Sequence, residues 1–174
     1  SAGNYTFFVP HNVEGLIKVM GGEKRFVDSL LGVFEEGHYD PTNEPDIAYP
    51  YLFSRIKGEE WRTQLLVKQL LKENYSTTPD GLPGNDDTGT MSAWAVFSMM
   101  GFYPDCPGEP YYTLTTPRFD HIEVDTEHGT ITIATEGEGD YIDEVKLGGK
   151  AINKYRISHD ELIGAKMLTF RLKN

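Results

Sequence analysis

The chain has 174 residues, and 39% hydrophobic and 12% aromatic content is enough for a core in one domain or two small ones. A formal net charge of −11 and a pI near 4.8 disfavour nucleic acids and anionic membrane surfaces as partners, because both bind clustered lysine and arginine. No apolar run reaches the roughly 18 residues of a membrane span, and a single cysteine, Cys106, excludes an internal disulfide and a cysteine-based zinc site. We expect a globular protein that binds cations or neutral ligands.

Residues 3–103 are patterned as helices. Apolar residues recur at intervals of three and four, and glycines or capping residues such as Asn12 punctuate the pattern. The predicted helices are 13–20, 23–36, an aromatic-rich helix through 47–56, 59–73 and 90–100. The last of these is apolar on nearly every face, so we expect it to be buried among other helices.

Residues 111–174 change to a strand pattern, with short β-branched runs separated by Gly, Pro and Asp. The predicted strands are 111–115, 122–125, 130–135, 142–147 and 167–172. Residues 104–110 are rich in proline and are the predicted linker. The sequence therefore predicts an α+β fold, with a helical part followed by a small antiparallel β unit.

The helical part is expected to be incomplete. Four or five helices with short connections, one of them apolar throughout, cover only part of a large helical assembly. We therefore expect a fragment whose apolar faces, near Phe7, Phe8 and the helix at 90–100, are covered by self-association into a homo-oligomer or by a rearranged helical packing.

A turn at residues 84–89 is the main candidate for chemistry. Asp86 and Asp87 lie between two glycines and just ahead of the unpaired N–H groups of the predicted helix at 90–100. The helix dipole there favours ionised carboxylates, which accept a proton, support a water or bind a hard cation. The alternative is that these residues only cap the helix.

Three stretches occur in a specific order and spacing. They are Tyr5 to His11; Asn43-Glu44-Pro45 with Pro50-Tyr51-Leu52 and Thr63-Gln64; and Gly84 to Trp94 followed by Gly101-Phe102-Tyr103-Pro104. Together they resemble the C-terminal portion of glycoside hydrolase family 92, the calcium-dependent exo-α-mannosidases common in gut Bacteroidetes. The resemblance extends from Tyr5 over essentially the whole chain. It implies the last helices of an (α/α)6 catalytic barrel followed by C-terminal β structure.

The resemblance also implies a function for the parent protein and roles for residues of this chain. Family members are inverting enzymes, and the implied substrate is α-1,2-linked mannose of glycans such as N-glycans. Asp87 matches the general base, and Asp86 or Asn85 is implied to hold the water or the base. Asn43 and Glu44 match the calcium-site motif, where the ion engages mannose hydroxyls; without the resemblance they are a loop and a cap. The parent protein is implied to be secreted, periplasmic or on the outer surface.

One family residue has no counterpart here. The general acid of the family is a glutamate in a Glu-Gly-Asn motif shortly before the Tyr-Thr-Phe stretch, and here Ala2 precedes Gly3-Asn4. We therefore expect the chain to be inactive alone and to retain calcium only if the site survives truncation. We also expect Asp87, Asn43 and Glu44 to converge on one cavity.

Two further residues are candidates for substrate binding. His11 can face the sugar or be structural, and Trp94 can stack on a sugar ring or belong to the core. Two rival functions are kept beside the mannosidase: a non-catalytic carbohydrate- or calcium-binding module, and a purely structural role. Binding of mannose and calcium to the chain discriminates the mannosidase fragment from the module, and an absence of binding leaves the structural role standing.

Overall fold

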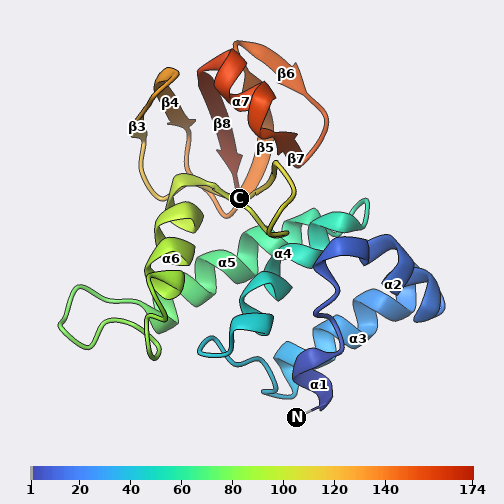
Figure 1. Ribbon diagram of the computed structural model, residues 1–174. Coiled ribbons are helices and arrows are strands. Elements are labelled where there is room, and N and C mark those ends of the chain that lie inside the picture. The colour runs from blue at the N-terminus through green and yellow to red at the C-terminus, as the bar shows by residue number, and fades with distance from the viewer. Residues whose placement is uncertain (1) are drawn as a thin grey trace.

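The computed structural model of the chain describes residues 2–174. A helical layer and a β layer lie against one another (Figure 1). The helical elements are α1 (Ala2–Tyr5), η1 (Pro10–Asn12), α2 (Val13–Val19), α3 (Glu23–Glu35), η2 (Glu44–Ala48), α4 (Tyr49–Leu52), η3 (Phe53–Arg55), α5 (Glu60–Asn74), α6 (Thr90–Met100) and α7 (His159–Ala165). Within residues 2–174, no helix is long and apolar enough to cross a membrane.

Four of the predicted helices are confirmed as α2, α3, α5 and α6. The side chain of Asn12 caps α2 as expected, because its Oδ1 accepts a hydrogen bond from the Gly15 backbone N–H at 2.9 Å. The single helix expected through 47–56 is wrong, since η2, α4 and η3 occupy this segment. Pro50 lacks the N–H that a continuous α-helix would need there, and the chain turns in short pieces instead.

The β layer consists of two sheets. The strands are β1 (Phe102–Tyr103), β2 (Tyr111–Leu114), β3 (His121–Thr126), β4 (Gly129–Glu136), β5 (Tyr141–Leu147), β6 (Lys150–Ile152), β7 (Arg156–Ser158) and β8 (Met167–Lys173). The orders are β1-β2-β7 and β3-β4-β8-β5-β6. The pair β4–β8 is parallel, so the expectation of a purely antiparallel unit is corrected. Strand alternation fixes which face is buried but carries no information on direction.

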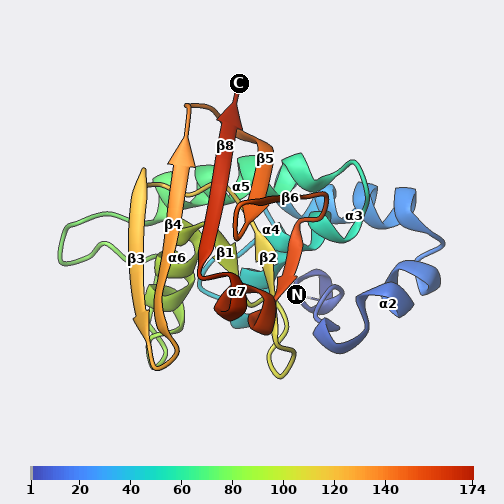
Figure 2. The same cartoon turned by 90° about the horizontal axis from the view of Figure 1, so that it is seen from above.

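Three groups of buried side chains form the core. One lies among α2, α3 and α4, one among η2, α5 and α6, and one within the β layer. Figure 2 shows the five-stranded sheet lying over the helices. Phe97 and Met100 from the end of α6 pack against the β cluster. The helical and β parts therefore share core packing.

Backbone hydrogen bonds also join the two parts. The Thr115 and Arg118 N–H groups donate to the carbonyls of Gly101 and Met99 at the end of α6, both at 2.9 Å. The predicted linker at 104–110 is packed rather than free, because Asp105 is buried and accepts a hydrogen bond from Arg55 at 3.1 Å. The division at 103 and 111 stays a prediction, and the sheet β1-β2-β7 crosses it.

The apolar side chains that the sequence analysis singled out differ in their exposure. Phe7 is 3% exposed because it packs edge-on against Phe26 and Tyr49. Phe8 and Val96 remain about half exposed, at 49% and 51%. Self-association through these two side chains stays a prediction.

Candidate functional site

The acidic turn at 84–89 has an unusual backbone. Asp87, Thr88 and Gly89 have φ angles of 45°, 64° and 95°, so three consecutive residues are in the left-handed region. Glycine adopts this region freely, but a β-branched threonine rarely does. Backbone strain of this kind costs free energy and is concentrated at functional sites. The turn is then held by the Thr90 hydroxyl, which donates to the Asp87 carbonyl at 2.8 Å.

Asp87 presents a half-buried carboxylate at this turn. Its Oδ1 accepts a hydrogen bond from the Asn85 side-chain amide at 2.6 Å. Within residues 2–174 its Oδ2 has no hydrogen-bond partner. One oxygen therefore orients the group while the other is free to accept a proton from water.

Asp86 has a different environment from its neighbour. Its Oδ1 accepts from the Ser92 backbone N–H at 2.8 Å and its Oδ2 from the Ser92 hydroxyl at 2.7 Å. These hydrogen bonds, the backbone one first, lower the pKa of the Asp86 carboxyl below its usual value. Each oxygen already accepts one hydrogen bond, so Asp86 caps the start of α6, and its predicted part in catalysis stays a prediction.

The Asn-Glu-Pro corner is built around a carboxylate that the sequence did not single out. Asp46 is 0% exposed and accepts hydrogen bonds from the side chains of Asn4 and Asn43, at 2.8 and 3.1 Å, and from the Asp40 backbone N–H at 3.0 Å. Asp46 thereby holds the Asn43 amide nitrogen and leaves the Asn43 Oδ1 facing away from it. The signal that was available is an acid two residues after Glu44.

Glu44 is exposed at the start of η2, and no hydrogen bond or ion pair engages its carboxylate within residues 2–174. It lines a cavity of about 290 Å³ together with Thr90, the first residue of α6. The other lining residues are Phe8, Pro10, Ile47, Ala48, Tyr103, Pro104, Asp105 and Pro107. The acidic turn lies against the residue before the corner, because a Cβ added at Gly84 would lie 2.8 Å from the Thr42 side chain. Asp87 and Asn43 do not line this cavity, so the expected convergence of Asp87, Asn43 and Glu44 is not seen in it.

Trp94 does not form a sugar platform. Its ring is 2% exposed, stacks on Tyr75 with centroids 5.5 Å apart, and donates through Nε1 to the Ile47 carbonyl at 2.8 Å. The prediction of sugar stacking is therefore wrong, since no ring face is accessible. The hydrogen bond instead ties α6 to η2, so Trp94 holds the acidic turn and the Asn-Glu corner in fixed relation.

His11 is exposed in η1, and within residues 2–174 its ring has no hydrogen-bond partner. It does not line the 290 Å³ cavity, although its neighbour Pro10 does. His11 therefore lies near the cavity without facing it, and its predicted contact with a sugar stays a prediction.

The residues that could hold calcium supply part of a coordination shell. Asn43 Oδ1 and the Glu44 carboxylate are hard oxygen ligands, and Asp46 fixes the first of them. No group of three His, Cys, Asp or Glu side chains suited to a metal occurs among residues 2–174. Since calcium takes about six to eight oxygens, most of its shell would come from water, substrate hydroxyls or other groups. The donors present fit such a shared site.

Comparisons with known proteins were made for the whole chain. The family model described as the glycosyl hydrolase family 92 catalytic domain matches residues 1–174. A curated relative from Arthroderma benhamiae, described as an uncharacterized secreted glycosidase, is 28% identical over 173 residues, covering 95% of this chain and 22% of the relative. The chain thus spans about a quarter of the length of the proteins that it matches.

Solved structures give the same result. A family 92 α-mannosidase from Bacteroides thetaiotaomicron is 31% identical with a TM-score of 0.88, covering 97% of this chain and 24% of that chain. A family 92 inverting mannosidase from the same organism is 27% identical with a TM-score of 0.87, covering 99% of this chain and 27% of that chain. The helical arrangement and the β layer described above are therefore shared with these enzymes.

Proposed function

This chain belongs to glycoside hydrolase family 92, and from that premise we propose that it is part of an inverting, calcium-dependent exo-α-mannosidase. The proposed substrate is α-1,2-linked mannose at the non-reducing end of glycans. The observation that supports this most is the acidic turn, where Asp87 keeps one free carboxylate oxygen and Gly84 lies against Thr42, the residue before the Asn43–Glu44 corner. The name of the secreted relative supports export of the parent protein.

The proposed role of Asp87 follows from its surroundings. In an inverting mechanism a carboxylate takes a proton from water while the water attacks the anomeric carbon, on the face opposite the departing oxygen. The Asn85 amide holds Oδ1 of Asp87 at 2.6 Å, which directs Oδ2 toward such a water. Asp86 contributes by fixing the start of α6, since both of its oxygens bind Ser92.

Asn43 and Glu44 are the proposed calcium ligands of this chain. When bound, the ion would bind and polarise mannose hydroxyls beside the attacked carbon. Asp46 positions Asn43 for this role through the 3.1 Å hydrogen bond to its amide nitrogen. Removal of Asp46 would free the Asn43 side chain to rotate and would weaken calcium binding.

A general acid is needed on the other side of the sugar. Such an acid must be protonated near neutral pH, which requires a raised pKa. Five carboxyl groups of this chain have a pKa that hydrogen bonds lower instead: Asp80, Asp86, Glu109, Asp143 and Glu161. Because Ala2 precedes Gly3-Asn4 where the family motif has the glutamate acid, we expect negligible hydrolysis by these 174 residues alone, and turnover by a longer protein that also carries the family's acid.

The test uses that longer protein and an α-1,2-linked mannobiose. Asp87→Asn is expected to lower kcat by about 10²–10⁴-fold, the usual contribution of general base catalysis. Glu36→Gln, at the exposed end of α3, is the matched control and should leave kcat unchanged. Proton NMR should detect the β-anomer of mannose first, and chelation of calcium should stop turnover. An Asp87→Asn enzyme of undiminished rate would remove Asp87 from the mechanism.

A further inference from the structure

A second cavity lies away from the acidic turn, where the helical and β parts meet. Its volume is about 380 Å³, within the range of roughly 300–1,000 Å³ common for small-molecule sites. The residues that line it include Lys68 of α5, Thr116, Arg118, Glu138 and Asp140. None of these residues lines the 290 Å³ cavity beside Glu44. We call this the junction pocket.

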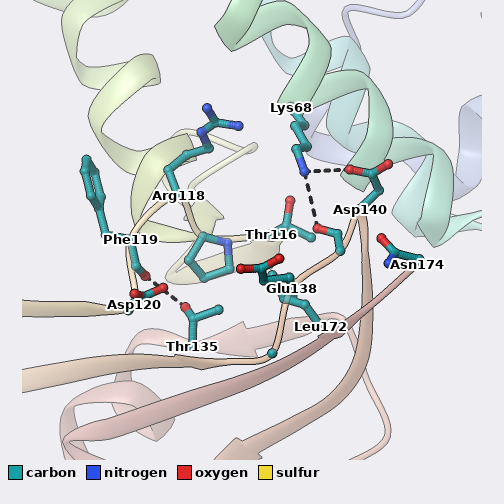
Figure 3. A pocket seen from close by; sticks show the side chains of 13 residues that line it. Lys68, Thr116, Arg118, Phe119, Asp120, Thr135, Glu138, Asp140, Leu172 and Asn174 are labelled. Atoms are coloured by element: carbon teal, nitrogen blue, oxygen red, sulfur yellow. Dashed lines mark hydrogen bonds and ion pairs between the residues drawn. The ribbon is translucent and has the colours of Figure 1, made fainter.

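One wall of the junction pocket is a turn that only glycine allows. A Cβ at Gly139 would lie 2.0 Å from the Lys173 carbonyl oxygen, and a Cβ at Gly137 would lie 3.1 Å from that of Leu172. Both glycines have positive φ, 76° for Gly137 and 155° for Gly139. The turn therefore packs directly on the end of β8 and presents Glu138 to the pocket (Figure 3).

A second wall is fixed by an ion pair. Lys68 on α5 contacts Asp140 at 2.5 Å and donates to the Gly139 carbonyl at 3.3 Å, as the dashed lines in Figure 3 show. Near them, the Gln64 side chain accepts from the buried Ile142 N–H at 2.8 Å. The turn is thus held to α5 from one side and to β8 from the other, so the pocket is preformed.

A threonine hydroxyl in this pocket lacks a protein partner. Thr116 is only 4% exposed as a residue and lines the cavity, and its hydroxyl makes no hydrogen bond to any of residues 2–174. The hydroxyl oxygen is not among the fully buried atoms without a partner, so it is accessible from the cavity, where water or a ligand can bind it. The Thr116 hydroxyl both donates and accepts, which suits the hydroxyl of a ligand.

The charges of the pocket narrow the class of ligand. Lys68 is paired with Asp140, while Arg118, Asp120 and Glu138 have no ion-pair partner within the part of the chain that the structure describes. Three carboxylates outnumber two cations, which disfavours an anionic ligand. The described residues hold no group of three acids suited to a metal. A neutral ligand rich in hydroxyls satisfies both the donors and the acceptors, and Pro117 and Leu172 offer an apolar surface to its C–H groups.

From these observations we propose that the junction pocket binds one pyranose unit of a neutral glycan, at a site separate from the acidic turn. The Glu138 carboxylate accepts hydrogen bonds from sugar hydroxyls. The Thr116 hydroxyl donates one hydrogen bond to the sugar or accepts one from it, and the Arg118 guanidinium donates to a sugar oxygen. The site needs neither calcium nor Asp87. It would hold a glycan at a second point on the β side of the molecule, so its existence does not depend on the hydrolysis proposed above.

The test is an NMR titration of the 174-residue chain with methyl α-D-mannopyranoside, in the presence of a calcium chelator. We expect saturable shifts of the amide signals of Thr116, Glu138 and Gly139. Glu138→Gln, in an exposed turn that tolerates the change, and Thr116→Val, which keeps the shape of the side chain, should each weaken binding by about tenfold. Glucuronate should bind more weakly than the neutral sugar.

Two controls separate this site from the catalytic proposal. Asp87→Asn should leave the affinity unchanged, and so should Glu127→Gln, which removes the same charge from an exposed turn outside the pocket. The proposal is overturned if no saturable shift occurs, if Glu138→Gln binds as tightly as the parent chain, or if the shifts map to residues 84–89. If the sugar titration fails, the kinetic test of Asp87→Asn is unaffected. If Asp87→Asn has no effect on kcat, the sugar titration can still be interpreted.

Discussion

The turn at 84–89 and the turn at 137–140 both hold acidic side chains between glycines, but they place backbone strain on different residues. In the second turn the glycines themselves have positive φ, and Gly139 has no room for a side chain. In the first turn the positive φ extends to Asp87 and Thr88, which carry side chains. Neither kind of turn can be told from the other by its composition.

The two turns differ in what explains their left-handed backbone. Gly139 is required because the backbone of β8 approaches it, so its geometry is explained by the fold alone. A glycine at position 88 would adopt the observed φ at lower cost, yet the chain has a threonine there. From this strain we predict that the position of the Asp87 side chain is under functional constraint. Three changes test this contrast, beginning with the largest expected effect.

Gly139→Ala should destabilise the chain strongly. The added methyl group meets the Lys173 carbonyl at 2.0 Å, and this contact is with backbone, which cannot rotate away. We expect a loss of about 3 kcal/mol or more in the free energy of unfolding, measured by urea denaturation. Gly149→Ala is the matched control, because φ there is 82° but no atom lies within 4 Å. It should cost only about 1 kcal/mol. Equal losses would mean that close approach is not what demands glycine at 139.

Thr88→Gly should stabilise the chain by about 1 kcal/mol, because relief of left-handed strain exceeds the backbone entropy lost by glycine. Thermal unfolding measures the gain. Thr77→Gly, in an exposed bend without positive φ, should give no gain. In a longer, active protein the Thr88→Gly change should lower kcat as the turn loosens. A variant that is both less stable and fully active would show that residue 88 is not strained for function.

Asp86→Asn should reveal the capping role through its pH dependence, with a shift in Tm of only a few degrees. The pKa of Asp86 is lower in the folded state than in the unfolded chain, chiefly because of the Ser92 N–H. Its stabilising contribution is therefore present above the unfolded pKa, near 3.9, and is lost as pH falls through the folded value. The difference in Tm between parent and variant should shrink over that acidic range.

Ser92→Ala is the comparison for this experiment. It removes the hydroxyl but keeps the backbone donor, so its effect should be smaller than that of Asp86→Asn. A difference in Tm that stays constant down through the acidic range would contradict the capping role of Asp86.

Much of the fold was predictable from the sequence because local patterns determine it. Periodic apolar residues gave α2, α3, α5 and α6, and alternation gave β2, β3, β4, β5 and β8. The short elements β1, β6 and β7 offered too few residues for a pattern. Helix α7 was missed although Ser158 and Glu161 form a capping box, a signal that the sequence contains.

The candidate site residues were predictable only where they belong to a sequence motif shared with the family. Asp87, Asn43 and Glu44 came from the family resemblance, and their roles stay predictions; the structure puts Glu44 and Thr90 on one cavity that Asp87 and Asn43 do not line. No local pattern distinguishes Asp86 from Asp87, since their roles depend on which one reaches Ser92. Asp46 and the junction pocket depend on contacts between distant segments, such as Asn4 with Asp46 and Lys68 with Asp140.

The hydrogen bonds at the end of α6 restrict how this protein can be dissected. The carbonyls of Met99 and Gly101 are satisfied by N–H groups of Arg118 and Thr115, which lie beyond the proline-rich segment. A fragment that ends between residues 104 and 110 would leave these two carbonyls without their hydrogen-bond donors and would expose Phe102. Chimeras that exchange the β layer between relatives should accordingly be joined elsewhere, for example in the exposed bend at 76–80.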